Sequence, residues 1–191
     1  MGQKFAAYDG SGNITAFYDS ADSPVPPEVS DVIQLTQAQW QAAISTAGCT
    51  VADGALVLPA PPTAAQQLAA AKVAQLDEIT SACQRTIVGG FMSSALGAQH
   101  AYPAQTIDQQ NLSASVLASL MPNLPSDWTT PFWCADASGN WTYAAHTAAQ
   151  IQQVGQEGKA AIIAAIQKKA DLAAKIGAAT TIPAVQAINW S

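Results

Sequence analysis

The first 58 residues alternate short apolar runs with turn-forming residues. Residues 5–19 contain two apolar and aromatic runs around a centre of Gly and Asn, and residues 50–58 contain two runs around Asp53 and Gly54. Such pairs between apolar runs are typical of β-hairpin turns, because these residues tolerate positive φ angles. The pattern therefore predicts two β-hairpins in this part of the chain.

Between the two hairpins, the pattern predicts a strand followed by a helix. Residues 32–35 form a short apolar run, and Thr36 is a good N-cap for a helix over residues 37–44. Gln39 stands three residues after Thr36, where a glutamine side chain completes a capping box.

A proline-rich segment separates this region from the rest of the chain. Residues 59–63 hold three prolines, and proline lacks the backbone N–H that helices and sheets use. The charge also changes here, because residues 1–58 carry six acidic residues and one basic residue, whereas residues 64–191 carry seven acidic and six basic ones. We expect two modules, 1–58 and 64–191, joined by the linker 59–63.

The second module is mainly helical. Apolar residues recur at three- and four-residue steps over residues 64–88 and 107–120, and again after Thr147, a second candidate N-cap. Gly155 and Gly158 are expected to weaken this third helix near its start. The helix carries a seam of heptad-like spacing, formed by Ile151, Val154, Ile162, Ala165, Lys169, Leu172 and Ile176. Such a seam fits packing against the first helix of the module as well as pairing in a homo-oligomer.

Two β segments interrupt these helices. Residues 91–102 predict a strand or a hairpin arm, and residues 128–143 predict a hairpin around Gly139 and Asn140. The tail, residues 180–190, predicts one or two capped helical turns that face inward. The predicted fold class is therefore α+β, with a small hairpin-rich N-terminal module and a helical module of about three main helices and an inserted antiparallel hairpin.

Charged residues are sparse in this chain. They make up 10% of its 191 residues, where a soluble domain usually has about 25%, and the net charge is −6. No basic cluster is present, which excludes nucleic-acid binding through phosphates. No apolar run approaches the ~20 residues that cross a bilayer, and the start does not resemble a signal peptide, so we expect neither membrane insertion nor general secretion. An uncharged surface rich in alanine and glutamine favours contacts with partner proteins.

Few residues are suited to catalysis. The chain has two histidines, and the pairs to consider are Cys134 with His146, or His100 with a serine and an aspartate. No nucleophile motif frames either pair. We expect a protein that is not an enzyme and has no catalytic residue and no cofactor, and we expect His146 to shape or cap the start of the helix that follows it.

Two segments share the pattern Asp-x-Ser-Gly-Asn-x-Thr, one beginning at Asp9 and the other at Asp136. Their oxygen ligands alternate as in a calcium loop, but the twelfth position holds Ser20 and Thr147 instead of a bidentate glutamate. We therefore expect no metal site. Turn chemistry is the favoured interpretation of the shared pattern, and duplication of a hairpin-plus-helix unit is the alternative.

Five tryptophans stand near the expected ends of elements. One tryptophan can bury ~150–250 Å², so the favoured interpretation is that they anchor the core of a thin, alanine-rich fold. The alternative is that the aromatic stretch before the third helix binds a sugar or a partner strand. Its candidate partner-binding residues are Trp128, Trp133, Trp141 and Tyr143.

Several short motifs occur together in residues 64–191. They are Gly89-Gly90-Phe91-x-Ser93-Ser94-Ala95-Leu96-Gly97, Tyr102-Pro103, Asp108-Gln109-x-Asn111-Leu112, Trp133-Cys134, Gly139-x-Trp141, His146-Thr147-Ala148-x-Gln150-x-x-x-Val154 and Ala179-Thr180-Thr181-x-x-Ala184-Val185-Gln186-Ala187-Ile188-x-Trp190. This set resembles a family of uncharacterised domains common in tail genes of tailed bacteriophages and prophages. The N-terminal module resembles tail-fibre assembly-type proteins in its Tyr8-Asp9-x-x-Gly12-Asn13 hairpin, its proline-rich loop and its Leu35-Thr36-x-x-Gln39-Trp40 helix start.

The resemblance implies no catalytic residue. It implies a protein of the virion tail or tail fibre, made in the host cytoplasm, which contacts other tail proteins. A transient tail-fibre assembly chaperone and a receptor- or glycan-binding fibre module are the alternatives.

Overall fold

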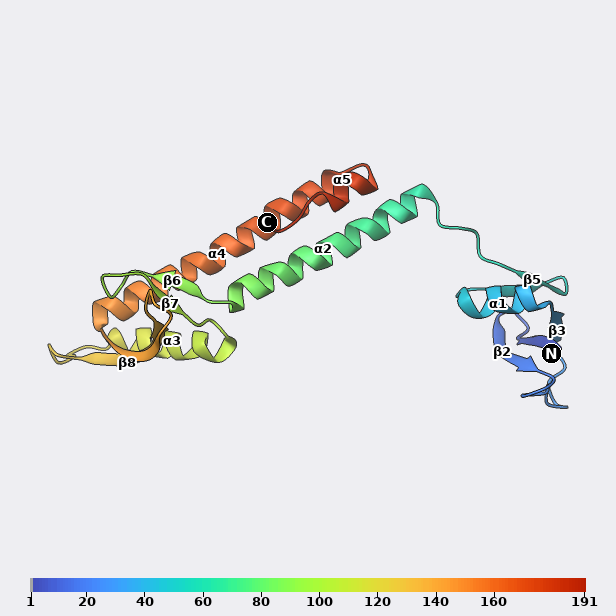
Figure 1. Ribbon diagram of the computed structural model, residues 1–191, viewed down its shortest axis with the longest axis horizontal. Coiled ribbons are helices and arrows are strands. Elements are labelled where there is room, and N and C mark those ends of the chain that lie inside the picture. The colour runs from blue at the N-terminus through green and yellow to red at the C-terminus, as the bar shows by residue number, and fades with distance from the viewer. Residues whose placement is uncertain (1) are drawn as a thin grey trace. The chain divides into compact units, whose positions relative to one another are not determined.

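The computed structural model of the chain describes residues 2–191 (Figure 1). The described residues form five helices and three small antiparallel sheets, which confirms the predicted α+β class. The chain divides into two compact units, Met1–Thr63 and Ala64–Ser191. Along residues 2–191, no helix combines the length and the apolar character that spanning a membrane requires.

The N-terminal unit contains a three-stranded sheet, one helix and a separate hairpin. The sheet has the strand order β2-β1-β3, and the hairpin pairs β4 with β5. The elements are β1 (Lys4–Tyr8), β2 (Ile14–Asp19), β3 (Val32–Leu35), α1 (Gln37–Ser45), β4 (Thr50–Ala52) and β5 (Ala55–Val57). The core is formed by four buried side chains, Ala6, Ile33, Leu35 and Val51. Trp40 of α1 packs against them.

The start of α1 confirms the predicted capping box. The Thr36 side chain accepts a hydrogen bond from the backbone N–H of Gln39, and the Gln39 side chain accepts one from the backbone N–H of Thr36. Two N–H groups that a helix start leaves unpaired are thereby satisfied.

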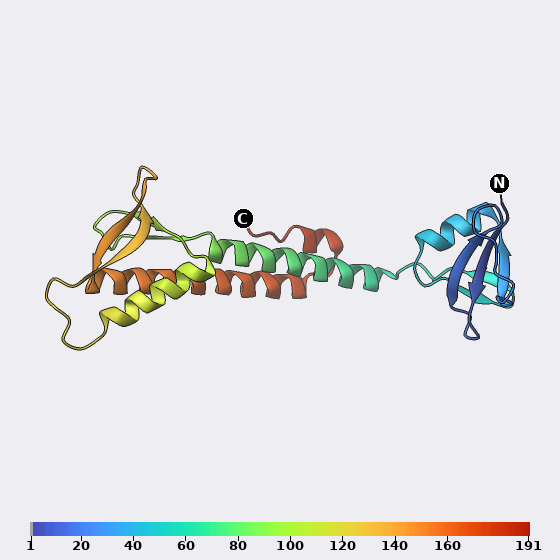
Figure 2. The same ribbon diagram turned by 90° about the horizontal axis from the view of Figure 1, so that it is seen from below.

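The C-terminal unit is built on two long helices, α2 (Ala64–Val88) and α4 (Ala148–Ala178), which run side by side (Figure 2). Thr147 caps α4 through a second capping box, with Gln150. A four-stranded sheet of order β6-β7-β8-β9 and the helix α3 lie toward one end of this pair. The remaining elements are β6 (Phe91–Ser93), β7 (His100–Tyr102), α3 (Thr106–Ser119), β8 (Thr129–Ala135), β9 (Trp141–Thr147) and α5 (Ile182–Gln186).

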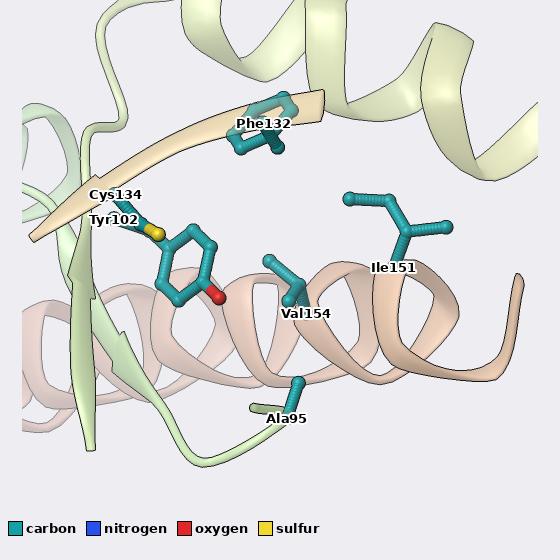
Figure 3. Packing of buried hydrophobic residues seen from close by; sticks show 6 residues of the cluster. All are labelled: Ala95, Tyr102, Phe132, Cys134, Ile151 and Val154. Atoms are coloured by element: carbon teal, nitrogen blue, oxygen red, sulfur yellow. The ribbon is translucent and has the colours of Figure 1, made fainter. Parts of the chain in front are cut away.

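The unit has two buried clusters. One lies between the sheet and the start of α4, where Tyr102 and Phe132 face Ile151 and Val154 (Figure 3). The other lies where α5 covers α2 and α4, and its buried members are Ile79, Ile176 and Val185. The predicted seam of α4 therefore packs within the chain, because its most buried residues contribute to these clusters.

Gly155 and Gly158 of α4 were expected to weaken the helix, but the helix runs through both without a break. A Cβ at Gly158 would lie 2.8 Å from the Phe91 ring, and a Cβ at Gly155 would lie 2.7 Å from a Val116 methyl group. The two glycines thus allow β6 and α3 to approach α4 closely, which offsets their lower helix propensity.

Candidate functional site

The inner face of the sheet holds a buried polar pair. The Tyr102 hydroxyl lies 2.8 Å from His146 Nε2, and His146 Nδ1 lies 2.9 Å from the Ala144 carbonyl oxygen. Because a carbonyl oxygen only accepts, Nδ1 carries the proton and Nε2 accepts from the Tyr102 hydroxyl. Burial lowers the pKa of His146 and raises the pKa of Tyr102, so both side chains are neutral.

This arrangement corrects the role expected for His146. The residue lies in β9 and ties it to β7, and Thr147 rather than His146 caps α4. Nor does His146 act as a base for Cys134, because both ring nitrogens are engaged elsewhere and burial raises the pKa of the Cys134 thiol. The second histidine, His100, directs Nδ1 to the Ala98 carbonyl oxygen at 2.9 Å.

The two Asp-x-Ser-Gly-Asn segments are hairpin turns. Asp9 Oδ1 accepts from the backbone N–H of Ser11 and of Asn13, both at 2.9 Å. Asp136 Oδ1 accepts the same bonds from the backbone N–H of Ser138 and of Asn140. Hydrogen bonds from the side chain and the backbone of Asn13 lower the pKa of Asp9, and those from the backbone and the side chain of Asn140 lower the pKa of Asp136. Among residues 2–191, no three His, Cys, Asp or Glu side chains are grouped to hold a metal ion.

The outer face of the sheet carries an aromatic cluster, formed by Trp133, Trp141 and Tyr143. Trp133 lies directly opposite Tyr143 in the register of β8 and β9, with 4.8 Å between ring centroids. Trp141 stacks on Trp133 at 6.0 Å. The exposed fractions are 38% for Trp133, 43% for Trp141 and 72% for Tyr143. The favoured expectation of core anchoring is therefore wrong for Trp133 and Trp141.

The strand register explains this exposure. Alternate residues of a strand point to opposite faces, so Phe132 and Cys134 enter the core while Trp133 points away from it. The register continues across all four strands, from Met92 through Ala101 and Ala135 to Trp141. Met92 therefore stands with the three aromatic residues on the face of the sheet opposite α4, with two alanines between them in the register.

The fourth predicted partner-binding residue lies elsewhere. Trp128 is half-buried and packs against the cluster of Tyr102 and Phe132. The structure therefore brings together three of the four predicted residues, and Trp128 anchors the core as the favoured interpretation expected.

A cleft of about 410 Å³ lies between the aromatic cluster and α3, and we call it the hairpin cleft. Trp133 and Tyr143 line one side, together with neighbouring residues of β8. The other side is formed by α3 and includes three polar residues that sequence reasoning did not identify as site residues: Asp108, Asn111 and Ser115. Their spacing of three and four residues placed them on one helical face, but nothing in the sequence indicated what that face meets.

A larger apolar groove of about 930 Å³ lies among α2, α3 and α4, and we call it the helical groove. Its apolar lining includes Leu112, Leu117, Leu120, Ile162 and Ile163, and Lys159 is the only charged residue among the lining side chains. Leu117, Leu120 and Ile163 are each more than half exposed. Sequence reasoning missed this groove, because the spacing of apolar residues along a helix does not show which of them a neighbouring element covers.

Comparison with known proteins gives one match. A protein family described as a domain of unknown function (DUF4376) matches residues 70–189. No curated protein and no solved structure matches the chain.

Proposed function

Because the chain belongs to the DUF4376 family, a domain of unknown function, we propose its role from its own motifs and surfaces. The chain is a non-enzymatic bacteriophage tail protein, a structural component of the tail or tail fibre that contacts other tail proteins. The motifs that resemble tail proteins of phages and prophages support this assignment. The protein is made in the host cytoplasm and resides in the virion tail.

The helical groove carries the proposal of protein–protein contact. Three of its lining side chains, Leu117 and Leu120 near the end of α3 and Ile163 on α4, are exposed by between 53% and 65%. Monomeric proteins rarely leave large contiguous apolar patches open to water, and such patches mark interaction sites. With Lys159 as the only charge in the lining, a partner covers this surface without removing many charges from water.

The buried polar groups agree with a non-enzymatic role. The Tyr102–His146 bond joins two strands, and Cys134 is a neutral, buried thiol. All three side chains contribute to holding the sheet on α4.

Mass spectrometry of purified virions tests the proposal. We expect the chain in fixed stoichiometry with known tail proteins. Absence from infectious particles would contradict a structural role, and if deletion of the gene then still prevented fibre assembly, the chain would be a transient chaperone.

Variants of the groove test which surface makes the contact. Replacing Leu117 and Ile163 together by glutamine should remove the chain from the particle while its circular dichroism stays native. Val73→Gln is the matched control, because Val73 is 59% exposed on α2 but does not line the groove. Normal incorporation of the double variant would refute the groove as the contact surface.

A further inference from the structure

We propose that the hairpin cleft is a binding site for a neutral saccharide. Two features carry the proposal, an exposed aromatic wall on β8 and β9 and a polar wall on α3. The inference stands on the geometry of the cleft and does not depend on the chain being a tail protein.

The aromatic wall suits the apolar face of a pyranose ring. Tyr143 is 72% exposed, and its ring centroid lies 4.8 Å from that of Trp133. Trp141 lies outside the cleft and supports this wall by stacking on Trp133. The register of β8 and β9 fixes the backbone of all three residues. Aromatic side chains have only two χ angles, so a ligand that packs on these rings costs little side-chain conformational entropy.

The polar wall suits the hydroxyl groups of a sugar. Asp108, Asn111 and Ser115 follow one another at three- and four-residue steps along one face of α3. Asp108 Oδ2 accepts from the backbone N–H of Gln105 at 3.0 Å, a bond that fixes the carboxylate and does not use Oδ1. The Asn111 amide and the Ser115 hydroxyl each offer a donor and an acceptor, which is what a hydroxyl group needs from its partners.

The size and charge of the cleft narrow the class of ligand. Its volume of about 410 Å³ falls within the range of roughly 300–1,000 Å³ that small-ligand sites occupy. Asp108 is the only charged side chain in the lining, so it repels a sugar acid. A neutral hexose or N-acetylhexosamine is the ligand that both walls accommodate.

A peptide strand is the competing ligand for the aromatic cluster, because β9 is the edge strand of its sheet. A strand added there would bond to the backbone of β9 and contact Tyr143. It would gain nothing from Asn111, which lies on α3 across the cleft. Substitution of Asn111 therefore separates the two ligands.

The test is an array of neutral and sialylated oligosaccharides probed with the full chain, followed by calorimetric titration of the best neutral ligand. We expect binding with a change in tryptophan emission. Tyr143→Ala and Asn111→Ala should each weaken binding at least about tenfold. Gln110→Ala, which changes an exposed residue on another face of α3, and Val73→Gln, on α2 outside both the hairpin cleft and the helical groove, should leave the affinity unchanged.

Three results would overturn the proposal. The first is that natively folded protein, judged by circular dichroism, binds no neutral saccharide even at millimolar concentration. The second is that Asn111→Ala binds the saccharide with unchanged affinity. The third is that the protein prefers sialylated oligosaccharides. Each is independent of the virion experiment, which uses the helical groove.

Discussion

One methyl group placed between α4 and Phe91 tests the close approach that Gly158 permits. In Gly158→Ala the new Cβ would lie 2.8 Å from Cζ, 3.0 Å from Cε1 and 3.2 Å from Cε2 of the Phe91 ring. The ring cannot simply move away, because it stacks on Tyr102 with 5.6 Å between centroids. Overpacking of this kind typically costs about 1–3 kcal/mol.

Helix propensity opposes this cost. Alanine is more favourable than glycine within a helix by about 1 kcal/mol, so the net destabilisation of Gly158→Ala should be about 0–2 kcal/mol. Gly177→Ala is the matched control in the same helix, because its Cβ meets nothing within 4 Å. That variant should gain about 0.5–1 kcal/mol, which leaves a gap of about 0.5–3 kcal/mol between the two variants.

Urea unfolding followed by far-ultraviolet circular dichroism measures this gap, provided that the slope of the transition is unchanged. Repeating Gly158→Ala in a Phe91→Leu background should remove most of its cost, because the two side chains are in contact. Equal stability of Gly158→Ala and Gly177→Ala in the natural background would refute the reasoning.

Three further predictions concern the cap of α4, the buried histidine and the thiols. Thr147→Ala should lower stability by about 0.5–2 kcal/mol, because the Thr147 side chain accepts the N–H of Gln150; an unshifted urea midpoint would contradict this. Burial lowers the pKa of His146, so the unfolded chain binds a proton that the folded chain does not. The free energy of unfolding should therefore be highest above about pH 6.5. Below that pH it should decrease by up to about 1.4 kcal/mol per pH unit. Urea midpoints between about pH 7.5 and 5.5 measure this fall, and His146→Gln should abolish it; an equal fall in the variant would assign the effect to another group. The three cysteines are buried: Cys49, Cys83 and Cys134. A thiol reagent should therefore modify them only in denaturant, which mass spectrometry measures. Rapid labelling of the native protein would contradict their burial.

The helices and their starts were predictable from the sequence because their signals are local. Thr36 with Gln39 and Thr147 with Gln150 lie within one helical turn of each other, and both capping boxes form. The α2 helix also spans the predicted residues 64–88, bounded by the prolines before it and Gly89 after it.

The exposure of the aromatic residues was not predictable, because it depends on contacts between distant segments. Alternation along β8 separates Trp133 from Phe132 and Cys134, but only the packing of α4 decides which face becomes the core. The same holds for Gly158, whose role appears only when Phe91 of β6 lies against it. The polar wall of the hairpin cleft likewise requires α3 and β8 to be neighbours.

The continuous helix α4 connects two places that a shorter helix would leave independent. Its 31 residues extend about 46 Å at a rise of about 1.5 Å per residue, with Ile151 and Val154 fixed under the sheet and Ile176 fixed under α5. Because α2 runs beside it, the helix cannot bend easily between these two anchor points. Within this unit, α4 therefore holds the sheet and α5 at a fixed separation.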